Sequence, residues 1–174
     1  MNRISAAIIV VVALLASLPA AASAAKAEKP NVVVIMTDDQ DFRSMSAMPY
    51  TSRLMSQRGT TFDQQMVNFP LCCPSRATFL TGQYAHNHGV KWNNFPQGGY
   101  QLLDGTETLP VWLGRAGYRT IHIGKYLNEY GEIDPTEVPK GWDEWWGGVD
   151  PTTYDYYGYT LNHNGKLRTY GREP

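Results

Sequence analysis

The residues best suited to chemistry stand at the start of a predicted helix. Cys72 and Arg76 lie four positions apart, so on a helix their side chains share one face. Pro74 fits the first turn of that helix, where its missing N–H is not needed, and Gly82 fits its end. The free amide groups of a helix N-terminus favour negative charge on a ligand or an oxyanion. The segment therefore combines a potential nucleophile with a guanidinium in a place suited to an anionic substrate.

A pair of carboxylates follows the first apolar run after the leader. Residues 31–37 are rich in β-branched side chains, which predicts a strand buried on both faces in a parallel sheet. Asp38 and Asp39 come directly after it, at the carboxyl end where ligands gather in open α/β sheets. Such a pair is also typical of turn and helix-cap residues. The alternative is a site for a hard cation, which prefers carboxylate oxygens.

Further elements are expected around these residues. Residues 49–56 are predicted to form a helix and residues 60–67 a second short strand. Residues 108–117 indicate a helix with a capping threonine, a first-turn proline and a closing glycine. Residues 118–123 follow as a strand, which places Lys125 beyond its carboxyl end. The order strand, helix, strand predicts an α/β fold with a mostly parallel sheet between helices.

The remaining residues carry weaker signals. Residues 128–174 are rich in Gly, Pro, Trp and Tyr, and such aromatic density favours core packing over a platform for sugar rings. His86 and His88 have no third ligand nearby, which weakens a metal interpretation. His88 is a candidate for the edge of a substrate site, whereas His122 and His163 are expected to be structural.

The composition and the first residues limit the classes of protein to which this chain can belong. The net charge of the 174-residue chain is −1. It therefore lacks the excess of basic residues that is typical of proteins binding nucleic acid or an anionic membrane. Residues 1–24 resemble a signal peptide cleaved near Ala24, because Arg3 precedes an apolar run and small residues. A membrane anchor is the competing interpretation, but the run is shorter than the roughly 20 residues needed to span a bilayer. Residues 25–174 are therefore expected to form one secreted or periplasmic domain.

The two cysteines are neighbours in the sequence. Exported proteins ordinarily pair their cysteines, but a disulfide between Cys72 and Cys73 would need a strained peptide that rarely meets disulfide geometry. An exposed free thiol is a liability in an oxidising compartment. A chemical role for one of the two is the better interpretation.

Residues 72–82 read Cys-Cys-Pro-Ser-Arg-Ala-Thr-Phe-Leu-Thr-Gly. This segment resembles the Cys-x-Pro-Ser-Arg-x-x-x-Leu-Thr-Gly signature of the type I sulfatases, which have an alkaline phosphatase-like fold. The resemblance implies that a formylglycine-generating enzyme oxidises Cys72 to formylglycine, whose hydrate attacks the sulfate ester. It further implies that Arg76 reaches the formylglycine oxygen and that formylglycine joins Asp38 and Asp39 in binding calcium. Three ligands fall short of the roughly 6 to 8 oxygens that calcium takes.

Residues 124–131 read Gly-Lys-Tyr-Leu-Asn-Glu-Tyr-Gly and resemble the N-acetylglucosamine-6-sulfatase branch of the family. The same branch is similar to this chain at residues 138–142 and 156–161. In the family the lysine, Lys125 here, contacts the sulfate. Many members carry a histidine two residues after it, where this chain has Leu127. Part of the leaving-group chemistry is therefore unassigned.

Taken together, the resemblance implies an exported, calcium-dependent sulfuric ester hydrolase acting on a sulfated sugar of the glycosaminoglycan type, for example N-acetylglucosamine 6-sulfate. Two alternatives stay open: a phosphomonoester or phosphonate hydrolase of the same superfamily, and an inactive carbohydrate-binding fragment. Family members carry later metal ligands in an Asp-Asn or Asp-His pair, and neither dipeptide occurs in this chain. Residues 25–174 are therefore expected to be the amino-terminal part of a catalytic domain, poorly stable and inactive alone.

Overall fold

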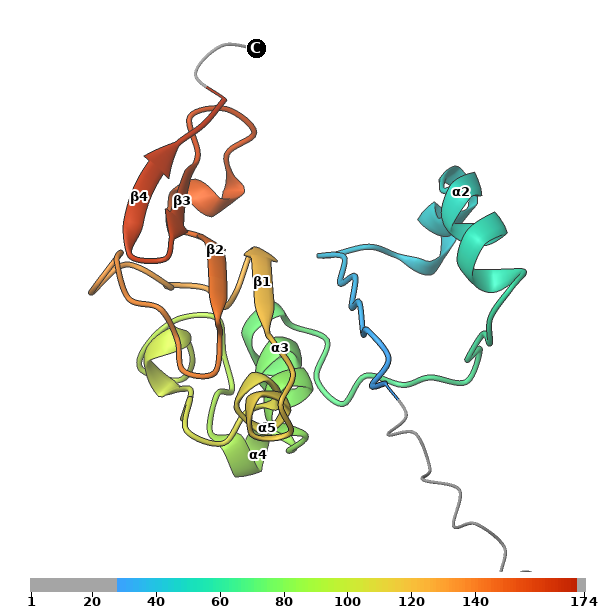
Figure 1. Ribbon diagram of the computed structural model, residues 1–174, viewed down its shortest axis with the longest axis horizontal. Coiled ribbons are helices and arrows are strands. Elements are labelled where there is room, and N and C mark those ends of the chain that lie inside the picture. Colours follow the sequence, from blue (N-terminus) through green and yellow to red (C-terminus); the bar gives the residue numbers. More distant parts are fainter. Residues whose placement is uncertain (1–27, 172–174) are drawn as a thin grey trace, which may run out of the picture. The chain divides into compact units, whose positions relative to one another are not determined.

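The computed structural model describes residues 28–171 (Figure 1). The chain divides into two units, one ending at Met36 and the other beginning at Thr37. In the first unit, residues 28–36 are extended and form neither helix nor strand. The signal peptide expected over residues 1–24 lies outside the described residues, so it stays a prediction.

The second unit contains a four-stranded sheet in the order β1-β2-β3-β4 (Figure 1). Its strands are β1 (Ile121–Gly124), β2 (Glu144–Gly148), β3 (Thr160–His163) and β4 (Lys166–Thr169). β1 and β2 are parallel, whereas β2 with β3 and β3 with β4 are antiparallel. The fold is therefore mixed α/β, and the expectation of a mostly parallel sheet is corrected.

The antiparallel half of the sheet comes from a tight hairpin that the sequence interpretation missed. Asn164 and Gly165 join β3 to β4 with φ angles of 47° and 84°. A two-residue Asn-Gly loop with both φ angles positive matches the twist of the strands it connects, and it makes them antiparallel. The Asn162 side chain supports the loop by accepting a hydrogen bond from the Gly165 amide at 2.7 Å. The Asn-Gly signal lay within residues 128–174, where no strand was predicted.

The helices are short. α3 packs against both α4 and α5. In residues 28–171 no helix is long and apolar enough to cross a membrane. The helical segments are η1 (Phe42–Ala47), α2 (Pro49–Thr51), the π-helical η2 (Ser52–Ser56), α3 (Cys72–Thr81), α4 (Ala85–His88), η3 (Tyr100–Leu102), α5 (Leu109–Arg115) and η4 (Thr152–Tyr154).

Two helices lie where the sequence predicted them. α3 begins at Cys72, ends at Thr81 and is capped by Gly82, whose φ of 66° is the left-handed conformation that glycine adopts without steric cost. α5 begins after Thr108 with Pro110 in its first turn. The Thr108 side chain makes no capping hydrogen bond, so only its extended backbone starts the helix. The helix predicted over residues 49–56 is also present, divided between α2 and η2.

Two predicted strands are absent from the described residues. Residues 31–37 and 60–67 contain no strand. In the first of these runs the side chains from Val32 to Met36 are exposed rather than buried. A strand needs a partner for its backbone hydrogen bonds, and an apolar run alone does not reveal whether a partner is present. The prediction of strands in these two segments was therefore wrong for this chain.

The core lies between α3, the segment after β1, and β2. Its fully or nearly fully buried members are Cys73, Ala77, Leu80, Val90, Tyr126, Leu127, Tyr130, Trp145 and Val149. The Tyr130 hydroxyl accepts hydrogen bonds from Trp145 Nε1 at 2.7 Å and Asn162 Nδ2 at 2.9 Å, and donates to the Glu137 carbonyl. These hydrogen bonds offset the cost of burying the polar groups of Tyr130, Trp145 and Asn162.

Much of the aromatic density belongs to this core, as expected. Trp145 stacks on the His122 ring at 4.5 Å between ring centroids and meets Tyr126 edge-on at 5.0 Å. Tyr156 and Tyr157, by contrast, are exposed. The structural interpretation of His122 fits its position in this stack.

His122 gives the core a dependence on pH. Burial lowers the pKa of its imidazole from 6.5 to about 4, because the charged ring would lose its hydration. Its unfolded form takes up a proton below pH 6.5 and its folded form only near pH 4, so this group destabilises the fold as pH falls through that window. The free energy of unfolding is expected to drop by about 2 kcal/mol between pH 7 and pH 5 from this residue alone. Urea unfolding of the wild type and His122→Phe at both pH values measures it, and equal losses in the two proteins would contradict the assignment.

Candidate active site

Cys72 is the first residue of α3 and is half-buried. Its Sγ lies 3.5 Å from Asp38 Oδ1, to which the thiol donates a hydrogen bond. The next residue, Cys73, is fully buried, and its amide donates to Asn93 Oδ1 at 3.0 Å. Cys73 therefore anchors the helix start in the core, while Cys72 faces the acidic pair.

Asp38 and Asp39 approach Cys72 from the loop that follows residues 31–37. Asp39 adopts a φ of 51°, a left-handed conformation that aspartate tolerates better than most residues. One ligand atom from each of Asp38, Asp39 and Cys72 lies within 4.8 Å of the other two. Two carboxylates suit a hard divalent cation, and an oxygen in place of sulfur at position 72 would improve the fit. These residues fit one side of a calcium shell.

Arg76 links the helix to the end of β1. Its Nη1 donates to the carbonyl of Lys125 at 2.7 Å and to that of Tyr126 at 3.2 Å. Its Nη2 lies 3.8 Å from Asp38 Oδ2. The guanidinium is thus held by two backbone carbonyls, beside the Asp38 carboxylate that also contacts Cys72.

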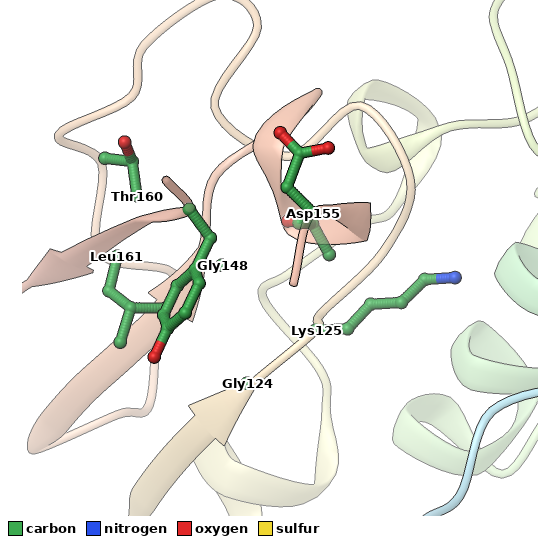
Figure 2. A pocket seen from close by; sticks show the side chains of 8 residues that line it. Gly124, Lys125, Gly148, Asp155, Thr160 and Leu161 are labelled. Carbon is green, nitrogen blue, oxygen red and sulfur yellow. The ribbon is translucent and has the colours of Figure 1, made fainter. Parts of the chain in front are cut away.

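Lys125 follows Gly124, the last residue of β1, whose φ of 101° turns the chain out of the sheet. Figure 2 shows its side chain extended beyond the end of β1, on the side away from Leu161 and Thr160. Its Nζ donates to Asp38 Oδ2 at 2.5 Å. Lys125 also borders an open hollow whose other lining residues are Gly124, Gly148, Thr153, Asp155, Tyr159, Thr160 and Leu161.

The charges of the site support one another. Partial burial opposes ionisation of Asp38, but the hydrogen bond and charge of Lys125 and the charge of Arg76 outweigh it and lower the pKa of that carboxyl. Burial likewise opposes the charge on Lys125, yet Asp38 raises the pKa of its ammonium. Burial and the Asp38 carboxylate raise the pKa of the Cys72 thiol. The site thus holds two cations and a protonated thiol around one carboxylate.

His88 lies apart from this group of contacts. Its Nε2 is 3.1 Å from Thr78 Oγ1, and its Nδ1 accepts a hydrogen bond from the Val90 amide at 3.1 Å. Nε2 therefore joins α4 to α3, and Nδ1 holds the backbone that follows α4. A substrate contact by His88 stays a prediction, and these bonds do not favour it.

Two further residues meet the site and were not singled out from the sequence. Tyr154, at the end of η4, places its ring 4.8 Å from Lys125 Nζ. Asn128 Nδ2 donates to the Tyr154 hydroxyl at 2.6 Å. Asn128 lies in the segment 124–131 that carried the family resemblance, but neither spacing nor residue type indicated that it would meet Tyr154.

Comparison with known proteins places the chain in a family. Residues 30–169 match the sulfatase family model, and the chain belongs to the sulfatase family. It is 46% identical over 147 residues to the Sulf-1 homolog of Caenorhabditis elegans, which is named as an extracellular sulfatase; the match covers 82% of this chain and 20% of that protein. It is 42% identical over 153 residues to N-acetylglucosamine-6-sulfatase of Homo sapiens, covering 82% of this chain and 27% of the relative.

A solved structure agrees with this placement. The chain superposes on BT4656, determined in complex with its substrate D-glucosamine-2-N,6-O-disulfate, with a TM-score of 0.64 and 27% identity. The superposition covers 83% of this chain and 28% of BT4656. The chain thus spans between 20% and 28% of the length of these three proteins.

Proposed function

We propose that this chain contributes the nucleophile and part of the metal site of an exported sulfuric ester hydrolase that acts on a sulfated sugar. Residues 25–174 would be the amino-terminal part of its catalytic domain. The observation that carries the proposal is the convergence of Cys72, Asp38, Arg76 and Lys125, because a thiol-bearing helix start meets two cations and a carboxylate there. Membership of the sulfatase family supports the reaction class.

Cys72 needs to be converted before it can act. Its raised pKa leaves the thiol protonated at neutral pH, which makes it a poor nucleophile as encoded. When present, formylglycine supplies a hydrated aldehyde whose hydroxyl attacks sulfur and which later releases sulfate by returning to the carbonyl. A formylglycine-generating enzyme is therefore the expected partner; it would catalyse the oxidation of the Cys72 side chain by an external oxidant such as dioxygen, with loss of the sulfur.

The remaining residues would neutralise and orient the sulfate. Lys125 offers an ammonium beside Cys72, where it would bind a sulfate oxygen. Arg76 is held by the carbonyls of Lys125 and Tyr126, so it keeps its orientation toward position 72. Asp38 and Asp39, together with an oxygen at position 72, would hold calcium, which supplies charge that neutralises the nucleophile and sulfate. The rest of the calcium shell would come from other residues.

The proposed substrate is a sulfated glucosamine unit. Relatives named as N-acetylglucosamine-6-sulfatase match most of this chain, and BT4656 binds a disulfated glucosamine. Relatives named as extracellular sulfatases and the leader-like residues 1–24 support a secreted or periplasmic location.

Mass spectrometry tests the first step. The protein is expressed from its complete gene together with a formylglycine-generating enzyme, and the peptide carrying Cys72 is expected to be lighter by about 18 Da, because an aldehyde replaces the thiol-bearing carbon. The same preparation is assayed on 4-nitrophenyl sulfate and 4-nitrophenyl phosphate with calcium. A preference for the sulfate supports the proposal, whereas an unmodified thiol in active enzyme, or a preference for the phosphate, would overturn it.

A further inference from the structure

We propose that Asn93 is a positioning residue for the nucleophile, because its side chain caps the helix that begins at Cys72. This inference rests on the proposed function and concerns the rate at which position 72 attacks the sulfate. Asn93 acts through the adjacent Cys73, whose backbone amide donates a hydrogen bond to Asn93 Oδ1 at 3.0 Å. The contact joins segments that lie 20 positions apart in the sequence.

The start of α3 has no cap from its own segment. In most helices the residue before the first turn accepts a hydrogen bond from the second or third helical amide. Here that residue is Leu71, whose side chain makes no capping hydrogen bond. The third helical residue is Pro74, which has no N–H to offer. The amide of Cys73, the second helical residue, is therefore the donor that needs an acceptor, and Asn93 supplies the oxygen that Leu71 cannot.

Asn93 is carried by a closed loop, residues 91–99, which we call the capping loop. Trp92 and Gly98 pair across it as a β-bridge, and the Gly99 amide donates to the Trp92 carbonyl at 3.2 Å. A β-carbon at Gly98 would collide with the Trp92 carbonyl oxygen, so the closure requires glycine at this position. The backbone on both sides of Asn93 is therefore held together, which fixes the direction of its side chain.

The capping loop is also attached to the segment that carries Lys125. Glu129, four residues after Lys125, accepts hydrogen bonds from Asn94 Nδ2 at 3.1 Å and from the Phe95 amide at 2.9 Å. One end of the loop's contacts is thus the helix start with Cys72, and the other is the chain that follows β1. The loop therefore sets how the nucleophile lies relative to the ammonium proposed to bind the sulfate.

Removal of the Asn93 side chain is expected to disturb position 72 first. Cys73 is 0% exposed, and a buried amide that loses its acceptor carries a desolvation cost. That cost is relieved if the first turn of α3 shifts, and Cys72 is the first residue of that turn. A shift of about 1 Å away from the reacting geometry is enough to slow an enzymatic step by about 100-fold.

The groups proposed to bind the sulfate are held by other contacts. Arg76 donates to the carbonyls of Lys125 and Tyr126, and Lys125 donates to Asp38. None of these contacts uses the Asn93 side chain. Loss of the cap is therefore expected to slow the attack while substrate binding is kept, so kcat falls and KM does not.

The test uses the calcium-loaded enzyme expressed from its complete gene, with rates expressed per converted molecule as counted by mass spectrometry. Asn93→Ala is expected to lower kcat on 4-nitrophenyl sulfate by about 10- to 100-fold and to change KM by about 2-fold or less. Asn93→Asp keeps an acceptor oxygen, and aspartate caps helices as well as asparagine does, so kcat should stay within about 3-fold of the wild type. Asn87→Ala removes the same atoms from an exposed asparagine of α4 and is the matched control, with kcat and KM unchanged.

Each other outcome overturns the inference. Full kcat in Asn93→Ala would show that position 72 does not depend on the cap, and an equal loss in Asn93→Asp would show that the acceptor oxygen is not what matters. A raised KM with unchanged kcat would assign Asn93 to substrate binding instead.

Two further results keep the test decisive. If circular dichroism shows that Asn93→Ala is unfolded, Asn93→Gln takes its place, because its longer side chain keeps the amide but displaces the oxygen; full kcat in that variant would contradict the cap. A wild-type enzyme that cleaves neither 4-nitrophenyl sulfate nor a sugar sulfate would reject the proposed function itself, and the inference with it.

Discussion

Replacing Cys72 with alanine is expected to abolish hydrolysis of both sugar and aryl sulfates, lowering kcat by about 10⁴-fold or more, as loss of a nucleophile does in other enzymes. The physical reason is that the Cys72 thiol lies against Asp38, whereas the adjacent Cys73 thiol is fully buried and contacts Asn128. The measurement is the rate on 4-nitrophenyl sulfate with saturating calcium. A fully active Cys72→Ala enzyme would end the proposal.

Two companion variants make this experiment specific. Cys72→Ser keeps a hydroxyl but cannot return to a carbonyl, so it should release at most one equivalent of 4-nitrophenol per enzyme and then stop. Cys73→Ser changes the adjacent, buried thiol and should leave the loss of about 18 Da at Cys72 in place, since the aldehyde forms on the first cysteine only. Conversion that disappeared with Cys73 instead would reassign the modified residue.

Trp145→Ala is expected to destabilise the fold by about 3 to 5 kcal/mol, the range measured for removal of a large aromatic side chain from a core. Trp145 is 0% exposed, and its Nε1 donates to the Tyr130 hydroxyl at 2.7 Å. Its ring also packs against His122 and Tyr126. Because domains are stable by only about 5 to 15 kcal/mol, the variant should be partly or wholly unfolded at 37 °C.

Urea unfolding followed by circular dichroism measures this loss. Trp92→Ala is the matched control, since the Trp92 side chain is 53% exposed and its truncation should cost about 1 kcal/mol or less. A smaller effect at Trp145 than at Trp92 would show that the aromatic cluster is not the stabilising core of this unit.

Local sequence signals determined the helices of the site. Pro74 in the first turn and Gly82 after the last turn predicted α3. In the same way, Pro110 and Gly117 predicted the start and the end of α5. These signals act within one turn of backbone: proline restricts φ at a helix start, and glycine permits the positive φ that ends a helix. No distant contact is needed for either, which is why the sequence alone was sufficient.

The strands behaved differently. The run at residues 31–37 has strong strand character but is unpaired and exposed. By contrast, β2 and β3 form within residues 128–174, where no strand was predicted. A strand exists only where another segment accepts its backbone hydrogen bonds, and that partner lies far away in the sequence. Local signals did mark β1, which overlaps the strand predicted over residues 118–123, and β4, which follows the Asn164-Gly165 turn.

In the candidate site, too, local sequence signals and tertiary contacts made separate contributions. The signature at residues 72–82 identified Cys72 and Arg76, and the residue types of Asp38 and Lys125 suited a cation and an anion site. Their meeting within hydrogen-bonding distance, across as many as 87 positions of sequence between Asp38 and Lys125, was decided by tertiary structure.

Tyr154 and Asn128 show what the sequence by itself could not supply. Asn128 reaches Tyr154 across 26 positions, and its side chain also contacts the buried Cys73. Residue types determined which chemistry was available to this protein. Packing decided which groups face one another, because hydrogen-bond direction and proximity exist only after the chain has brought its distant segments together.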